Sequence, residues 1–369
     1  MNSSTKLTSA LRALDRLDSP CPIESLEPRI APASVSVAYT DFDGDIVKVI
    51  ATKPGLTAPP LDSTDLLFVD GTTDGQLKTL NLTEAGFDGA SITFKVARKA
   101  GGNGFADVGF INAAGVDLNK VVVKGDLGKV IAGDSITTRD GGLNLLKVAS
   151  MGGRGLSSQG GTGDLHSIVT GLLGALTVAG DFIDARLEAL ATIPSDGQIG
   201  SISVGGDLAG SSGIFSGQIH TSGATGDIRI GGSVIGGGGD SSGQVFSEGP
   251  IGKVWVGGDI VGGGGDVAGQ IGTLGAMGDV RVKGDIVGGT ILGAGGVVSR
   301  GAMGNVRIDG DVVGGTAEAT GFVSGGEIGD VRIGGSLKGG YIYSYGTMGN
   351  VRVDGTFSEG SSIQCAEEN

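Results

Sequence analysis

Three aspartates alternate along a short segment near the start of the chain, Asp41, Asp43 and Asp45, and Gly44 precedes the last of them. Alternating carboxylates open the calcium loop of EF-hand proteins, in which glycine stands sixth and glutamate twelfth. Here glycine is fourth and the twelfth residue is Thr52. An Asp-Gly pair between two β-like runs also predicts a hairpin turn. We therefore expect a turn whose three aspartates are a candidate for weak Ca²⁺ binding, and no other cofactor.

The segment 239–243, Gly-Asp-Ser-Ser-Gly, matches the pattern of a nucleophile elbow around Ser241. One repeat later, residues 265–269 read Gly-Asp-Val-Ala-Gly, with valine in place of the serine. A catalytic serine also needs a general base. No motif links the two histidines of the chain, His166 and His220, to this serine. The pattern predicts a variable corner loop, and we assign no catalytic residue.

Two sets of polar residues recur in the later repeats. One position holds Asp227, Asp279, Asn305, Asp330 and Asn350, and the position two residues later holds Arg229, Arg281, Arg307, Arg332 and Arg352. Residues two apart in a strand point to the same side. Stacked repeats would therefore place an acidic column beside a basic one, which relieves the repulsion of like charges about 4.8 Å apart. The columns suggest either a charged binding stripe or a solvated face that deters lateral aggregation, and we favour the second interpretation.

The residues above lie on a repeat that dominates the second half of the chain. A Gly, a polar residue, a Val/Ile–x–Val/Ile core, a Gly-rich corner and another apolar residue recur in order. The leading glycines are Gly200, Gly226, Gly252, Gly278, Gly304, Gly329 and Gly349. Their spacings are 26, 26, 26, 26, 25 and 20 residues. A fixed period of roughly 20–50 residues indicates stacked units, each unable to bury its apolar face alone.

Each repeat offers three short apolar runs that alternate or pair, such as 280–282, 286–287 and 270–272, separated by glycine corners. A helical repeat would need longer stretches free of glycine. We therefore predict an all-β chain that forms a parallel β-helix, with three-sided coils of about 26 residues. The usual chirality of parallel crossovers predicts a right-handed coil.

The first part of the chain has a different pattern. Strand-like runs at 35–39 and 46–50 flank the Asp-Gly turn, and further runs occur at 66–69 and 91–96. We predict four segments along the chain. They are a poorly ordered leader or linker at 1–35, an N-terminal β cap or small β domain at 36–112, the Gly-rich solenoid at 113–361 and a tail at 362–369.

Composition limits the classes of partner that the chain is expected to bind. The net charge of −14 and the lack of clustered Lys and Arg argue against nucleic acid as a partner. No stretch approaches the 18 apolar residues expected of a transmembrane helix. The N-terminus also lacks the apolar run of a secretory signal. The two cysteines, Cys21 and Cys365, show neither metal-ligand spacing nor a disulfide framework.

The leader contains Leu-Glu-Pro-Arg-Ile-Ala-Pro at 26–32, and the sharpest repeat reads Met-Gly-Asp-Val-Arg-Val-Lys-Gly-Asp-Ile-Val-Gly-Gly at 277–289. These motifs resemble the LEPR-type tag and the Gly-rich β-solenoid arrays of large proteins of the bacterial cell envelope. The segment 41–47 resembles the start of the domain that often precedes such arrays. The resemblance implies export to the envelope or surface and a structural or adhesive role, and it carries over no catalytic residues.

We therefore expect a non-enzymatic, secreted or surface-exposed β-solenoid that acts as a spacer or adhesive stalk. Its partners would be envelope or surface components, including glycans. The alternative is a β-helical protein that binds or cleaves polysaccharides, as a lyase or hydrolase. The sequence leaves the oligomeric state open.

Overall fold

A computed structural model describes residues 33–54, 59–135, 141–190 and 197–366. Of the predicted leader, only residues 33–35 belong to these ranges, and they begin the first strand. The motif at 26–32 lies outside the described residues. The predicted tail contributes a last strand at 362–365.

The first part of the chain begins as an antiparallel sheet, as the Asp-Gly turn predicts. Strand β1 pairs antiparallel with β2, β2 with β5, and β3 with β4. Parallel pairing then takes over, from β4 to β6 and from β5 to β7. The strands of this part are β1 (Ala33–Thr40), β2 (Ile46–Lys53), β3 (Leu66–Phe68), β4 (Leu77–Asn81), β5 (Ala90–Ala97), β6 (Val108–Ala114), β7 (Leu118–Gly133) and β8 (Leu143–Met151). Short 3-10 helices lie at η1 (Ser63–Asp65), η2 (Ala85–Phe87) and η3 (Gly155–Gln159).

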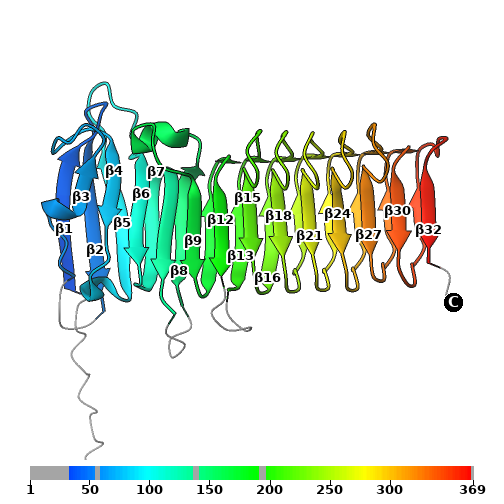
Figure 1. Ribbon diagram of the computed structural model, residues 1–369, viewed down its shortest axis with the longest axis horizontal. Helices are drawn as coiled ribbons and strands as arrows, with labels where there is room; N and C mark the ends of the chain where they lie inside the picture. The colour runs from blue at the N-terminus through cyan, green and yellow to red at the C-terminus, as the bar shows by residue number, and fades with distance from the viewer. Residues whose placement is uncertain (1–32, 55–58, 136–140, 191–196, 367–369) are drawn as a thin grey trace, which may run out of the picture. The chain divides into compact units, whose positions relative to one another are not determined.

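Beyond β8 the chain winds into coils with three sides, and each coil except the last contributes one strand to each side (Figure 1). The first side consists of β10 (Leu173–Val178), β13 (Ile199–Val204), β16 (Thr225–Ile230), β19 (Val254–Val256), β22 (Val280–Val282), β25 (Val306–Ile308), β28 (Val331–Ile333) and β31 (Val351–Val353). The second side consists of β11 (Phe182–Ile183), β14 (Leu208–Ala209), β17 (Val234–Ile235), β20 (Ile260–Val261), β23 (Ile286–Val287), β26 (Val312–Val313) and β29 (Leu337–Lys338).

The third side consists of β9 (His166–Thr170), β12 (Arg186–Leu190), β15 (Gln218–Thr221), β18 (Gln244–Ser247), β21 (Gln270–Thr273), β24 (Gly296–Ser299), β27 (Phe322–Gly325), β30 (Tyr341–Ser344) and β32 (Ser362–Cys365). Its labelled strands lie side by side in Figure 1, and a loop projects beside most of them. The predicted all-β fold and the parallel, three-sided coil are confirmed. The right-handed sense stays a prediction.

The 26-residue period sets the register between coils. Val254 pairs with Val280, and Val280 pairs with Val306, so like residues stack above one another. Every such residue is buried, as are the matching positions of the other two sides, for example Ile260 and Ile271. Each buried Val or Ile stabilises the fold by about 1.5–3 kcal/mol relative to an exposed one. The alternation that the sequence predicts therefore forms one continuous apolar core through the stack.

Glycine is required where neighbouring coils approach closely. A Cβ on Gly226 would lie 1.8 Å from the carbonyl oxygen of Gly200 in the coil before it. No rotation of a side chain relieves that clash, because the obstructing atom belongs to the backbone. The leading glycines of the repeat thus keep consecutive coils within hydrogen-bonding distance. Among the described residues, no helix is long and apolar enough to cross a membrane.

Candidate functional site

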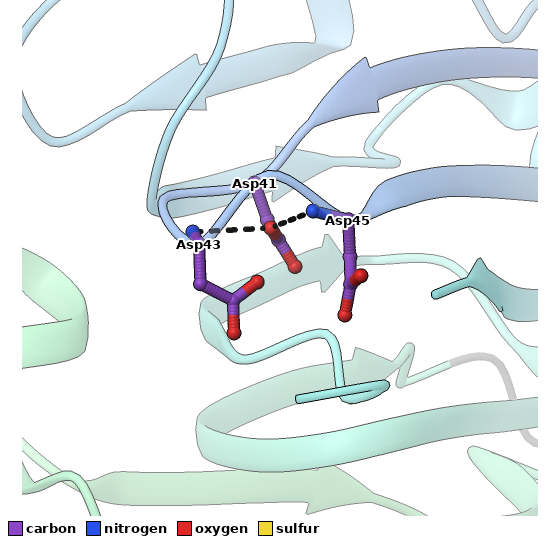
Figure 2. A group of neighbouring side chains, drawn as sticks. All are labelled: Asp41, Asp43 and Asp45. Carbon is purple, nitrogen blue, oxygen red and sulfur yellow. Dashed lines mark hydrogen bonds between the residues drawn. The ribbon is translucent and has the colours of Figure 1, made fainter. Parts of the chain in front are cut away.

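The three aspartates predicted as a calcium candidate gather in the turn between β1 and β2 (Figure 2). One carboxylate oxygen from each lies within 4.8 Å of the others. Asp41 Oδ1 accepts the backbone N–H groups of Asp43 (3.2 Å) and Asp45 (2.8 Å). The fully buried Asp45 accepts the N–H groups of Lys99 and Gly104, both at 2.6 Å. The carboxylates therefore organise the hairpin turn, as the simpler interpretation predicts.

The same turn has unusual protonation chemistry. Partial burial, together with the hydrogen bond to Asp43, raises the pKa of Asp41 to about 6. Burial also acts to raise the pKa of Asp43, but hydrogen bonds from Asp41 and from the backbone of Asn103 and Asp45 outweigh it and lower that pKa. Asp43 Oδ1 is buried without a hydrogen-bond partner. Below a pH of about 6 a cation would have to compete with a proton on Asp41, and Ca²⁺ binding at this turn stays a prediction.

Ser241 lies in a corner loop of the third side, where the repeat comparison places it. Its backbone is left-handed, with φ of 53°, and its N–H donates to the carbonyl of Asp266 at 2.8 Å. The equivalent residues of neighbouring coils, Phe215 and Val267, adopt the same conformation with φ of 62° and 48°. The left-handed backbone is therefore a property of the corner and is not specific to the serine.

The predicted arginine column is present on the first side. Arg281 is in register with Arg307, Arg307 with Arg332, and Arg332 with Arg352. At the equivalent positions before them, Arg229 lies 3.7 Å from the ring centre of Trp255, a cation–π contact.

The acids paired with these arginines lie outside the predicted columns. Asp309 binds Arg307 Nε at 2.7 Å and Arg281 Nη2 at 3.0 Å, and these hydrogen bonds lower the pKa of Asp309. Asp354 binds Arg332 Nη2 at 2.9 Å and also binds Arg352. All five arginines are exposed. Ion pairs at such a surface contribute little to stability, about 0–1 kcal/mol each.

The predicted Asp/Asn column has a structural task that the sequence reasoning did not foresee. In four of its five members, all but Asn350, a side-chain oxygen accepts the backbone N–H of a residue one coil further along. Asp279 Oδ1 accepts from Asn305 N at 3.0 Å, and Asn305 Oδ1 accepts from Asp330 N at 2.9 Å. Asp330 Oδ1 accepts from Asn350 N at 2.8 Å, and Asp227 Oδ1 accepts from Lys253 N at 2.8 Å.

A second ladder of the same kind was missed by the sequence reasoning. It runs without a break from Asp181 through Asp207, Ser233, Asp259, Asp285, Asp311 and Ser336 to the backbone of Thr356. Its distances lie between 2.6 and 3.0 Å. The sequence contained a sign of this ladder, because Asp or Ser follows the glycine corner in each coil from Asp181 to Ser336. We call these residues the corner ladder.

Both histidines meet at one buried carboxylate on the third side. Glu188, 7% exposed, binds His166 Nε2 at 2.5 Å and also binds Arg186, and its Oε1 lies 3.4 Å from His220 Nδ1. The other ring nitrogen of His220 lies 3.4 Å from Glu248 Oε1. No spacing in the sequence predicts this cluster, because the coils here differ in length. Registers of 20 to 32 residues bring the groups together.

A groove lies beside this cluster. Its volume is about 380 Å³, and its lining includes Ser241, His220 and Phe246, with the amides of Gln218, Gln244 and Gln270. Ser241 and His220 thus share a cavity, but both ring nitrogens of His220 face carboxylates.

A larger cavity, about 700 Å³, is lined in part by the buried Asp107 and Asp126. Both acids are engaged. Asp107 binds Arg154 Nε at 2.7 Å, and Asp126 accepts from Ser150 Oγ at 2.6 Å and Gly153 N at 2.9 Å. These two carboxylates hold the turn that follows β8.

Comparisons with protein-family models, with curated proteins and with solved structures find no match to this chain.

Proposed function

We propose that this chain is a non-enzymatic β-solenoid of the cell envelope or surface, or a secreted one, that serves as a structural spacer or adhesive stalk. The observation that carries the proposal is the corner ladder. In most coils of the stack, one Asp or Ser side chain binds the backbone of the next coil. The polar residues that recur from coil to coil therefore hold neighbouring coils together.

The candidate chemical groups support the same proposal. Ser241 occupies a repeated corner, Asp107 and Asp126 hold a turn, and four of the five exposed arginines pair with acids. The location rests on the resemblance of the leader and the repeats to LEPR-tagged envelope proteins. We propose no cofactor, apart from weak Ca²⁺ binding at the turn between β1 and β2.

The second candidate is a protein that binds or cleaves polysaccharides. The groove on the third side favours binding, because it combines amide groups with aromatic rings.

An assay of reducing ends separates the two activities. The purified chain, incubated with neutral and acidic polysaccharides at several pH values, should release no reducing ends above a heat-treated sample. Release that grows with time and protein concentration would overturn the non-enzymatic proposal. Recovery of the native protein in the envelope or culture medium would support the location.

A further inference from the structure

The outward surface of the third side differs in character from that of the first. On the first side, arginine repeats at one outward position from coil to coil. On the third side the outward residues change at nearly every step. One row of positions that face away from the apolar core reads Arg186, Gln218, Gln244, Gln270, Gly296, Phe322 and Tyr341, and the next reads Glu188, His220, Phe246, Gly272, Val298, Ser324 and Tyr343. The three glutamines and Phe322 are nevertheless buried, with exposed fractions of 3–5%. Cohesion between coils does not require this variation, which indicates a further role for the third side.

Aromatic and imidazole rings concentrate on this side. Both histidines of the chain and three of its four tyrosines lie on it or directly beside it. His220 stacks on Phe246, with ring centres 5.9 Å apart and planes at 17°. Further along, Tyr341 stacks on Phe322 at 5.2 Å and 6°. Tyr345 remains 65% exposed. The rings therefore follow the stacking direction of the coils.

The corner loops turn part of this side into a groove. Phe215, Ser241 and Val267 line it from the loops, and the glutamines line it from the strands. Gln218 Nε2 donates to Gln244 Oε1 at 2.8 Å, and Gln244 Nε2 donates to Gln270 Oε1 at 3.4 Å, so the buried amides form a hydrogen-bonded row along the groove. The volume of about 380 Å³ lies within the range of roughly 300–1,000 Å³ that is usual for ligand sites.

The groups in and beside the groove carry both signs of charge. Arg186 binds Glu188 and also lies over the ring of Phe215, 4.2 Å from its centre. His220 lies between Glu188 and Glu248. An anionic ligand would have to compete with these carboxylates, and a cationic ligand with Arg186. The balance favours a ligand without charge.

We propose that the third side binds a neutral polysaccharide that runs along the stack of coils. Sugar rings present C–H faces that pack on aromatic rings, and hydroxyl groups that bond to polar side chains such as that of Ser241. A polymer suits rings that are spread over several coils of the third side, since these coils are stacked about 4.8 Å apart. This inference rests on the second candidate function and specifies its ligand as a neutral polymer, and it does not depend on where the chain is located.

Affinity electrophoresis of the full chain tests the proposal. Native gels would contain hydroxyethylcellulose, a mixed-linkage β-glucan, a β-1,3-glucan, a galactomannan or dextran, with polygalacturonate as an anionic comparison. At least one neutral polymer should retard the protein, and titration calorimetry would then give its affinity. Phe246→Leu, which keeps the apolar packing and removes the ring, should weaken binding about tenfold, the order of one lost aromatic contact.

One control and one further variant make the result specific. Trp255→Ala removes an aromatic ring from the first side and should leave the affinity within about twofold, since one ring outside the site is energetically silent. Tyr345→Ala removes an exposed ring from the third side and should also weaken binding, and circular dichroism would check that the variant is folded.

Three results would overturn the proposal. They are no retardation by any neutral polymer, retardation by polygalacturonate alone, or equal losses from Phe246→Leu and Trp255→Ala. Failure to bind would leave the spacer role standing, and binding without release of reducing ends is compatible with both proposals.

Discussion

Removal of one rung of the corner ladder should measure how strongly the ladder holds the coils together. Asp285 is half-buried, and its Oδ1 accepts the N–H of Asp311 at 2.7 Å. Its own N–H donates to Asp259 Oδ1 at 2.8 Å, a bond that survives side-chain substitution. Asp285→Ala therefore removes a single hydrogen bond between coils, namely the one to Asp311.

The expected loss follows from the type of bond. A hydrogen bond to a charged acceptor contributes about 1.5–3 kcal/mol. The lower end applies here because water can reach the half-buried site and solvate the freed N–H. We expect Asp285→Ala to lower the free energy of unfolding by about 1.5 kcal/mol. Asp285→Asn keeps an acceptor oxygen, as Asn305 does in the other ladder at 2.9 Å, and should cost only about 0.5 kcal/mol.

Urea unfolding followed by circular dichroism gives the global loss, and hydrogen exchange gives the local one. The amide of Asp311 should exchange about tenfold faster in Asp285→Ala, since 1.4 kcal/mol corresponds to a factor of ten. Glu318→Ala, which removes the same charge from an exposed loop, should change stability by less than about 0.5 kcal/mol. The reasoning fails if Asp285→Ala equals Glu318→Ala, or if Asp285→Asn costs as much as Asp285→Ala.

Three further predictions concern other parts of the stack. Gly226→Ala should lower the free energy of unfolding in urea by about 2–3 kcal/mol. Gly238→Ala should be nearly neutral, because the nearest atom to the added Cβ, Ser212 Cα, is 3.8 Å away, and equal effects of the two variants would contradict the close approach of the coils at Gly226. Val267→Asn should raise stability by about 0.5–1 kcal/mol, because a β-branched residue is strained at φ of 48° and asparagine is not; a lower urea midpoint would refute this. At the β1–β2 turn, the raised pKa of Asp41 means that its contribution to stability is greatest below about pH 4 and is lost as the pH rises through about 6. Ca²⁺ should therefore raise the Tm at pH 7.5 and not at pH 5, and no shift at either pH would exclude the site.

The regular part of the fold could be predicted because the 26-residue period sets both which residues pair between coils and which of them are buried in the core. Valines at 254, 280 and 306 are 26 residues apart and alternate with polar residues, which allows only stacked strands with one face inward. The hairpin at the start followed from a single Asp-Gly pair.

The rest depended on contacts that break the period. Glu188 meets His166 and His220 through register steps of unequal length, which no repeat comparison could supply. The corner ladder was visible as a recurring Asp or Ser, but an exposed acid in a sequence looks the same whether it is solvated or bonded to the next coil. Arg281 and Arg332 bind Asp309 and Asp354 of the next coil, because an arginine side chain is long enough to reach a neighbouring coil.

The location of the protein is the most direct test of its proposed role. Cys365 is exposed, and replacement of Cys21 by serine would leave it as the sole thiol. Intact cells of the native host would be treated with a membrane-impermeant maleimide, and labelling would be compared with that after lysis. The proposed envelope or surface location predicts strong labelling of intact cells, or recovery of the protein in the medium. Labelling only after lysis, with all of the protein in the cytosolic fraction, would contradict it.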